Sequence, residues 1–340
     1  MSSKKFRMRL TEDEQKLIVE HRALEQECEE KGIPIDSVNH YWYKGKHFSL
    51  HVKNDSVSMD SMREDIIKEM NKYSPKYNKI ERTKSKDSHC LVVDPADVHI
   101  GKLATAFETG EDYNSQVAVK RVLEGVKGIL DKTSGFNIDK IILIGGNDIL
   151  HIDTPKRTTT AGTPQDTDGM WYDNFLIAKK LYVELIEQLV SIADVRFVYN
   201  PSNHDYTNGF FLADVIQSWF RNHPNISFDC SIANRKYFRY HNNLIGTTHG
   251  DGAKVHDLPL LMAQEAPSEW AQTKHRYVYT HHVHHKNAKD FIGVTVESLR
   301  SPSGADSWHH RNGYQHNPKA IEGFIHHPEH GQVARLTHIF

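Results

Sequence analysis

The feature that most constrains this fold is the stretch from residue 141 to residue 151, IILIGGNDILH. Four aliphatic residues in a row are typical of a strand buried on both faces, as in a parallel sheet. Gly145 and Gly146 then allow a sharp turn, and Asp148 and His151 follow at the carboxyl end of the strand, where ligands of open α/β sheets bind. Taken alone, the stretch is better explained as a strand followed by a helix-capping Asp. Four more segments repeat the same layout, however, and together they favour a site.

Composition excludes several classes of protein. The 340 residues are 38% apolar and 25% charged, enough for one large domain, alone or with a small appendage. A net charge of −2 means that any contact with nucleic acid must come from a local patch. The three scattered cysteines read as buried thiols in a reducing compartment. No signal peptide is visible and no apolar stretch approaches the roughly 18 residues that span a membrane, so we expect a cytoplasmic protein without membrane contact.

Residues 1–86 form a predicted accessory segment of α+β type. A helix is expected over 12–31, a hairpin over 38–52 and a short helix over 60–70. From residue 66 to residue 86 there are seven Lys or Arg against two acids, interleaved with Tyr73 and Tyr77. This basic stretch predicts either a nucleic-acid-contacting arm or a solvated linker, and both interpretations stay open.

Residues 87–340 change to an alternation of strands and helices, which predicts a mainly parallel sheet. A long loop rich in Thr, Pro and Gly, residues 153–170, is expected on the rim of a site. After residue 230 the pattern becomes strand-rich. The expected strands are 91–93, 140–145, 195–199, 236–240, 243–248, 277–280 and two within 320–340, and the expected helices are 114–131, 172–193 and 210–221.

Acids, amides and histidines follow five of these strands. Carboxylate oxygen, imidazole nitrogen and an amide oxygen are ligands of borderline-hard divalent metals, and a metal pair needs one carboxylate between its ions. A redox iron site would need only two histidines and one acid, and structural zinc would take four ligands from few segments. Neither explains so many clusters, which are Asp97/His99, Asp148/His151, Asn203/His204/Asp205, His249 and His282/His284.

In order along the chain these clusters read Asp-x-His, Gly-Asn-Asp, Asn-His-Asp, Thr-His-Gly and His-x-His. The ordered set resembles the five motifs of the calcineurin-like metallophosphoesterases, over roughly residues 88–300. The resemblance implies an α/β protein: a four-layer α/β/β/α sandwich for residues 87–340, with the small N-terminal α+β extension before it. It also implies a hydrolase that uses two divalent metal ions. Oxygen-rich sites with imidazole suit Mn²⁺ best, with Mg²⁺, Zn²⁺ and Fe²⁺ as alternatives.

Carried over residue by residue, the resemblance implies two ligand sets that share Asp148. Asp97, His99 and His284 would hold the first metal, and Asn203, His249 and His282 the second. His204 would stabilise or protonate the leaving oxygen, and Asp205 would orient the His204 imidazole.

The spacing of Asp148 and His151, Asp-x-x-His, is similar to the DNA-repair exonuclease branch, the SbcD-like nucleases. In that branch the extra histidine positions the phosphate of the nucleic acid. The Asp-Arg pair of the phosphoprotein phosphatase branch is absent here.

Some residues depart from the family pattern or stay open. His281 replaces a glycine, which leaves His281 or His285 as alternative ligands, although both are better explained as plain neighbours. Ser202 likewise stands where glycine is usual, and Asn147 is an extra residue. Three acids near the motifs, Asp153, Asp251 and Asp257, fit loop capping. A further group could bind a substrate phosphate or base or form a surface loop: Trp308, His309, His310 and Arg311.

We therefore expect a metal-dependent phosphodiesterase, most simply a DNA exonuclease or endonuclease, with DNA as its partner. The alternative is a phosphomonoesterase or cyclic-nucleotide phosphodiesterase, with residues 1–86 as a lid or an oligomerisation module. A non-catalytic binding scaffold is disfavoured by the complete ligand set. No ATPase partner is expected, because no long C-terminal helical segment is visible, and a homo-oligomer is compatible with the sequence.

Overall fold

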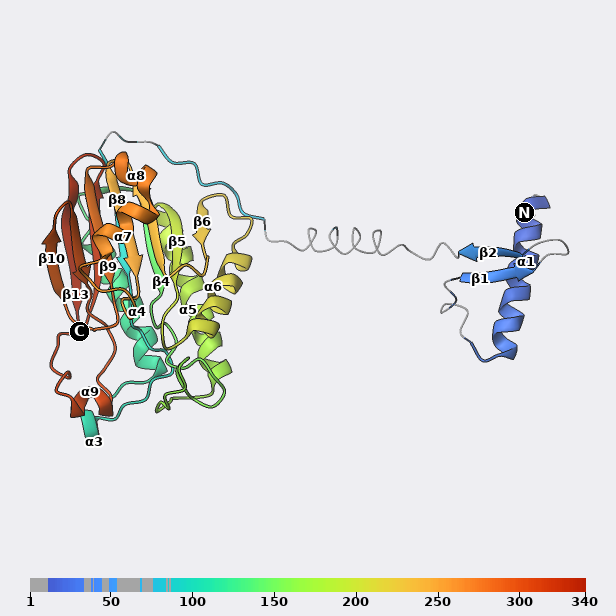
Figure 1. Ribbon diagram of the computed structural model, residues 1–340, viewed down its shortest axis with the longest axis horizontal. Helices are drawn as coiled ribbons and strands as arrows, with labels where there is room; N and C mark the ends of the chain where they lie inside the picture. Colours follow the sequence, from blue (N-terminus) through green and yellow to red (C-terminus); the bar gives the residue numbers. More distant parts are fainter. Residues whose placement is uncertain are drawn as a thin grey trace, which may run out of the picture. The chain divides into compact units, whose positions relative to one another are not determined.

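The computed structural model describes residues 12–33, 38, 40–44, 49–53, 68, 76–83, 85 and 87–340. The chain divides into two compact units, Met1–Ser74 and Pro75–Phe340, each considered by itself (Figure 1). Within the described residues, no helix has the length and apolar character needed to cross a membrane.

The smaller unit holds helix α1 (Glu12–Glu30) and the antiparallel pair β1 (His40–Lys44) and β2 (Ser49–Lys53). These elements confirm the predicted helix and hairpin. Helix α1 ends at Gly32, whose φ of 63° lets the chain turn so that the Ile33 amide donates to the Cys28 carbonyl. The helix expected over residues 60–70 lies almost wholly outside the described residues.

The larger unit is built on two sheets. In the first, the four strands β3 to β6 are parallel and β12 runs antiparallel to β3. The order of this sheet is β13 (Gly331–Ile339), β12 (Ala320–His327), β3 (Ser88–Asp94), β4 (Asn137–Gly146), β5 (Asp194–Asn200) and β6 (Ile226–Asp229). The order of the second sheet is β10 (Asn287–Phe291), β11 (Val294–Ser298), β9 (His275–Thr280), β8 (Asn243–Thr248) and β7 (Arg235–Tyr240).

Side-chain alternation along β3 explains the layers. Leu91 and Val93 face a helical layer, whereas Cys90 and Val92 face the second sheet, and all four side chains are fully buried. Burying such a side chain contributes about 1.5–3 kcal/mol. The helical layer consists of α4 (Ser115–Asp131), α5 (Trp171–Ile192) and α6 (Tyr206–Trp219) (Figure 1).

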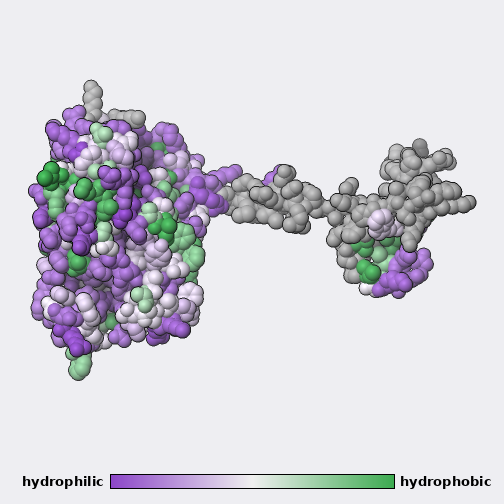
Figure 2. All heavy atoms as spheres, viewed as in Figure 1, coloured by the Kyte–Doolittle hydropathy of each residue, from purple (hydrophilic) through white to green (hydrophobic). Residues whose placement is uncertain are grey.

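The outer side of the second sheet is covered by α7 (Leu258–Glu265) and α8 (Pro267–Ala271). There, Leu258 and Met262 of α7 pack on Leu244 and Val278. The larger unit is therefore the expected α/β/β/α sandwich. On the face drawn in Figure 2, hydrophilic residues dominate its surface and hydrophobic residues lie in small separate groups.

Several short elements were not predicted. Strands β6, β10 and β11 and helices α3 (Ala106–Thr109), α7, α8 and α9 (Ser307–Arg311) have only four to eight residues each, which leaves little room for a clear periodic pattern. Strand β10, for example, reads NAKDF and lies almost entirely exposed at a sheet edge, so backbone pairing with β11 defines it.

The segment from residue 76 to residue 83 is hydrogen-bonded to the sandwich. The Ile80 amide donates to Asn225 Oδ1 at 2.8 Å, and Asn225 Nδ2 donates to the Ile80 carbonyl at 2.9 Å. Arg82 Nε lies 3.0 Å from Asp194 Oδ1. These contacts join the last part of the basic stretch to the first sheet.

Candidate metal centre

The candidate site lies beyond the carboxyl ends of five strands, three in the first sheet and two in the second. Asp97 and His99 follow β3, Asp148 and His151 follow β4, and Asn203 and His204 follow β5. From the second sheet, His249 follows β8, and His282 and His284 follow β9. Because the two sheets face each other, these loops meet at one end of the sandwich.

The loops that carry the site have unusual backbone conformations. Six non-glycine residues within the motifs have φ between 51° and 70°: Asp97, His99, Asn147, Asp148, His282 and His284. Such conformations cost about 1–3 kcal/mol each and cluster at functional sites. Backbone hydrogen bonds fix them, with the Asp97 amide donating to the Asn147 carbonyl at 2.8 Å and the His99 amide donating to the Asp148 carbonyl at 2.9 Å. The strained residues are therefore held by pairing between neighbouring loops.

Asp97, His99 and His284 form the first group. His284 Nε2 lies 3.4 Å from Asp97 Oδ1 and 3.3 Å from His99 Nε2. All three offer ligand atoms within 4.8 Å of one another, close enough for one metal ion to draw together. This is the set expected for the first metal.

Asp148, His249 and His282 form the second group, with ligand atoms equally close. His249 Nε2 lies 3.2 Å from Asp148 Oδ2 and 2.8 Å from Asn203 Oδ1, so the amide oxygen joins the same group. The same Asp148 oxygen lies 3.9 Å from His99 Nε2 of the first group. Asp148 thus stands between the two groups, where a bridging carboxylate would be.

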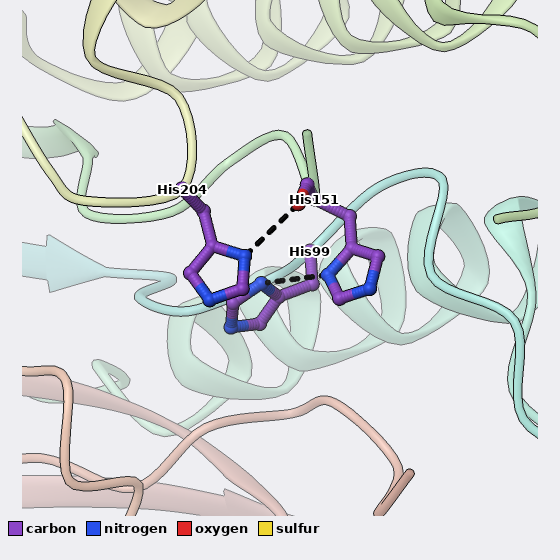
Figure 3. Close-up of side chains that lie close together, drawn as sticks. All are labelled: His99, His151 and His204. Atoms are coloured by element: carbon purple, nitrogen blue, oxygen red, sulfur yellow. Dashed lines mark hydrogen bonds between the residues drawn. The ribbon is translucent and has the colours of Figure 1, made fainter. Parts of the chain in front are cut away.

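His151 and His204 complete a third histidine group with His99 (Figure 3). His204 Nδ1 donates to the His151 carbonyl at 2.9 Å, and the His204 amide donates to Asp148 Oδ1 at 3.0 Å. The rings of His151 and His204 are stacked, with centroids 5.3 Å apart, and His151 Nδ1 lies 3.3 Å from His99 Nδ1. The orientation of His204 is therefore set by a backbone carbonyl.

This arrangement corrects the role expected of Asp205. Its carboxylate is buried and accepts hydrogen bonds from the Leu150 amide at 2.8 Å and from Ser202 Oγ at 2.6 Å. Ser202 Oγ in turn accepts from the Asp148 amide at 2.7 Å. The geometric reason is that the His204 imidazole already has its partner in the His151 carbonyl. Asp205 instead fixes the loop that carries Asp148.

The electrostatics favour charged carboxylates, with neutral imidazoles at His99 and His151. His249 differs: burial alone would lower its pKa, but the Asp148 charge outweighs burial and raises the pKa of His249 to about 9. Burial by itself would raise the pKa of Asp148, but His249 and His204 lower that pKa well below its usual range. The pKa of Asp97 is also lowered, since His284 outweighs the effect of burial. Burial and neighbouring cationic groups lower the pKa of His99 and of His151, and neutral imidazole is the form that binds metals. Burial and the Asp148 charge raise the pKa of Asp205 to about 7.

A cavity of about 530 Å³ opens onto these groups. Part of its wall comes from the Thr- and Pro-rich loop, including Thr159, Thr163 and Gln165, as expected for a rim loop. Sequence reasoning missed Lys102 and Asp306, which also line it. The nearby Asp-x-His motif was the available signal for Lys102, whereas Asp306 is brought to the cavity by tertiary structure alone.

The remaining candidates fall outside the two metal-binding groups. His281 is buried and its Nε2 lies 3.0 Å from both Asp94 oxygens, and His285 Nδ1 bonds the Val283 carbonyl. Asp153 accepts from the Thr207 and Asn208 amides at the start of α6, which confirms the capping role. Trp308 and His309 line the cavity, but His310 and Arg311 are not among its lining residues.

Comparison with known proteins gives similarity only among solved structures. No family model matches the chain, and no curated protein matches it. A single mutant of Vps29 from Entamoeba histolytica is 13% identical and has a TM-score of 0.31, with 74% of this chain and 99% of that chain covered.

Wild-type Vps29 complexed with Zn²⁺ from the same organism is 11% identical, with a TM-score of 0.29 and coverage of 73% and 98%. An archaeal phosphodiesterase is 10% identical, with a TM-score of 0.34 and coverage of 74% and 99%. At such low identities and TM-scores these similarities carry no weight for the chemistry of the site, which depends on this chain's own residues.

Proposed function

We propose that this protein is a metal-dependent phosphodiesterase of the calcineurin-like metallophosphoesterase superfamily that cleaves DNA, in the manner of its SbcD-like exonuclease branch. The observation that carries the proposal is the position of Asp148 within 3.2 Å of His249 and 3.9 Å of His99, between two groups of metal-ligating atoms. Mixed imidazole and carboxylate donors suit a pair of divalent ions, and Mn²⁺ is the metal we favour.

The ligand sets proposed are Asp97, His99 and His284 for one ion, and Asn203, His249 and His282 for the other, with Asp148 shared. When bound, the ions would supply an activated water and neutralise the charge of the phosphate. The proton transfer to the leaving oxygen is assigned to a side chain of the protein.

His204 is proposed to act on the leaving oxygen. Its Nδ1 proton is held by the His151 carbonyl, which leaves Nε2 to hold the proton that the leaving oxygen takes up. Its amide is tied to Asp148, so the imidazole and the shared carboxylate keep a fixed relation. His204 also lines the cavity, as the role requires.

A substrate of nucleic-acid type is supported by His151, which keeps the Asp-x-x-His spacing and lies on the cavity wall beside His99 and His204. The second candidate is a phosphomonoesterase or cyclic-nucleotide phosphodiesterase. The size of the cavity favours it, because about 530 Å³ is enough for one nucleotide.

The test is hydrolysis with added Mn²⁺ of labelled single- and double-stranded DNA, bis-p-nitrophenyl phosphate and a 2′,3′-cyclic nucleotide. Asp148→Ala serves as the blank, since it removes the shared carboxylate and should lose both metals. Cleavage of DNA at low enzyme concentration supports the nuclease. Adding p-nitrophenyl phosphate as a monoester covers the rest of the second candidate. Turnover of the small esters alone supports the second candidate, and no turnover of any substrate, the monoester included, contradicts both.

A further inference from the structure

One wall of the cavity comes from residues outside the five motifs. It consists of α9 with the residues before it, which contribute Asp306, Ser307, Trp308 and His309, together with Lys102 from the loop after β3. In the chain, residues 306–309 lie some twenty positions beyond the last motif, whereas Lys102 follows the first motif. The proposed chemistry uses none of them.

This wall is anchored. Lys102 is 1% exposed, and its Nζ lies 2.9 Å from Asp306 Oδ2. Asp306 caps α9 by accepting from the His309 amide at 2.9 Å, and its carboxylate also lies 2.7 Å from His309 Nδ1. Ser307 Oγ donates to Glu108 Oε2 at 2.6 Å, which ties α9 to α3 beside it (Figure 1). A buried ion pair and a helix cap therefore fix this segment, unlike a free surface loop.

The anchored segment presents an indole at the mouth of the cavity. Trp308 is 61% exposed, and its ring contacts those of His309 and Tyr314, with centroids 5.2 Å and 5.7 Å away. His309 in turn stacks on His284 of the first metal-binding group, with centroids 5.2 Å apart and ring planes 18° apart. The indole is thus one ring away from the groups that would hold the phosphate.

An exposed indole at the mouth of the cavity is suited to binding a flat ring of the substrate. Every nucleobase offers a π face, and stacking on an aromatic side chain fixes a base without hydrogen-bond readout. The anchoring also means that little conformational entropy is lost when a ring is bound. A small alkyl phosphate has no ring that could stack on the indole.

We propose that Trp308 is the stacking platform for a nucleobase of the substrate, next to the phosphate that is cleaved. This rests on the proposed phosphoesterase function and narrows its substrate to nucleotides, whether in a strand or free. Lys102 and Asp306 are positioning residues that hold the platform in place.

Two esters with the same leaving group test the proposal. Thymidine 5′-(p-nitrophenyl phosphate) and methyl p-nitrophenyl phosphate differ only in the nucleoside, so the ratio of their kcat/KM values measures recognition of the nucleoside. Trp308→Ala should lower this ratio about tenfold, the size of a lost base stack, mainly through KM. Trp308→Phe should keep most of the preference, since an aromatic face remains.

The matched control is Trp219→Ala, which removes another exposed indole, 46% accessible, on α6 away from the cavity lining. It should leave the ratio unchanged. If the unaltered protein hydrolyses the methyl ester but Trp308→Ala keeps the full nucleoside preference, the platform is wrong and the phosphoesterase stands. If the unaltered protein hydrolyses neither ester, the proposed phosphodiesterase is wrong, and the stacking platform is wrong with it.

Discussion

Asp148 and His204 have different proposed roles: Asp148 binds metal, and His204 acts on the leaving oxygen. Asp148 touches both metal-binding groups through one oxygen and holds the His204 amide through the other. His204 offers an imidazole whose Nδ1 is occupied by a backbone carbonyl. Substitution of Asp148 should therefore remove the metals, whereas substitution of His204 should lower turnover and leave the metals bound.

His204→Ala should lower kcat by about 10²-fold or more, because a positioned proton donor contributes roughly 10²–10⁴-fold. Metal content, measured by elemental analysis after dialysis, should stay near that of the unaltered protein. His285→Ala is the matched control, since His285 lies in the same histidine-rich part of the chain but outside the metal-binding groups. Loss of metal in His204→Ala would contradict the assigned role.

Gly146, the last residue of β4, has a role set by backbone geometry. Its φ is 77°, and a Cβ there would lie 1.9 Å from the Asn200 carbonyl oxygen. Gly135 also has a positive φ, 96°, but a Cβ there would meet nothing within 4 Å. Alanine at Gly135 therefore introduces only the strain of a positive φ, whereas alanine at Gly146 adds a steric clash with Asn200.

Gly135→Ala should lower the free energy of unfolding by about 1–2 kcal/mol, the cost of a left-handed alanine. Gly146→Ala should cost clearly more, because the carbonyl and the strand pairing of β4 with β5 must shift. Urea denaturation of the two variants measures the difference. Equal losses would mean that the close approach to Asn200 is relieved without cost.

At the scale of elements, β12 carries a buried histidine between the two sheets. His326 is fully buried, its Nε2 donates to the Tyr279 hydroxyl at 2.9 Å, and its Nδ1 has no hydrogen-bond partner among the residues that the structure describes. Burial lowers the pKa of His326 to about 3. In the unfolded chain the pKa would be about 6.5, so the unfolded state binds a proton first as the pH falls.

The neutral His326 therefore contributes stability that is complete above about pH 6.5 and is lost progressively as the pH falls toward about 3. Between these values the loss from this group approaches about 1.4 kcal/mol per pH unit. His326→Gln, which keeps a donor for Tyr279 but does not titrate, should have a shallower decline of unfolding free energy between pH 6 and pH 4. Parallel declines in the two proteins would rule this out.

At the scale of the whole chain, the basic stretch belongs partly to the sandwich. The sequence predicts an accessory segment over residues 1–86, whereas the smaller compact unit ends at Ser74 and residues 76–83 bond to Asn225 and Asp194. A truncation after residue 74 therefore tests the role of the smaller unit, and a truncation after residue 86 also tests the contacts of residues 76–83.

Deleting residues 1–74 should leave hydrolysis of a small diester intact but weaken action on long DNA, through lost phosphate contacts that depend on salt. Deleting residues 1–86 should in addition lower the free energy of unfolding by about 1–3 kcal/mol, because Asn225 loses its two hydrogen bonds with Ile80 and Asp194 loses the Arg82 guanidinium. Equal stability of the two truncated proteins would contradict the structural role of residues 76–83. Equal loss on both substrates in the shorter deletion would mean that residues 1–74 serve the site itself.

Local sequence determined the strands and the residues that follow them. The run from Ile141 to Ile144 is apolar at every position because β4 is buried on both faces, and turn glycines followed by acids or histidines mark where such strands end. Parallel strands leave their carboxyl ends at one edge, which predicts that the clusters after β3, β4 and β5 lie together. The ligands from the second sheet were expected there because of the family resemblance. Short edge elements such as β10 carry no comparable pattern, since backbone pairing alone defines them.

Tertiary structure alone decided the partners of these side chains. Whether His204 is oriented by Asp205 or by the His151 carbonyl depends on loop conformations with positive φ, which residue types do not encode. The wall of the cavity also depends on tertiary packing. Lys102 and Asp306 are some two hundred residues apart in the chain, and their ion pair anchors the polar segment that contains α9. Periodicity reports which face of an element is buried, but contacts between distant loops depend on how the two sheets face each other.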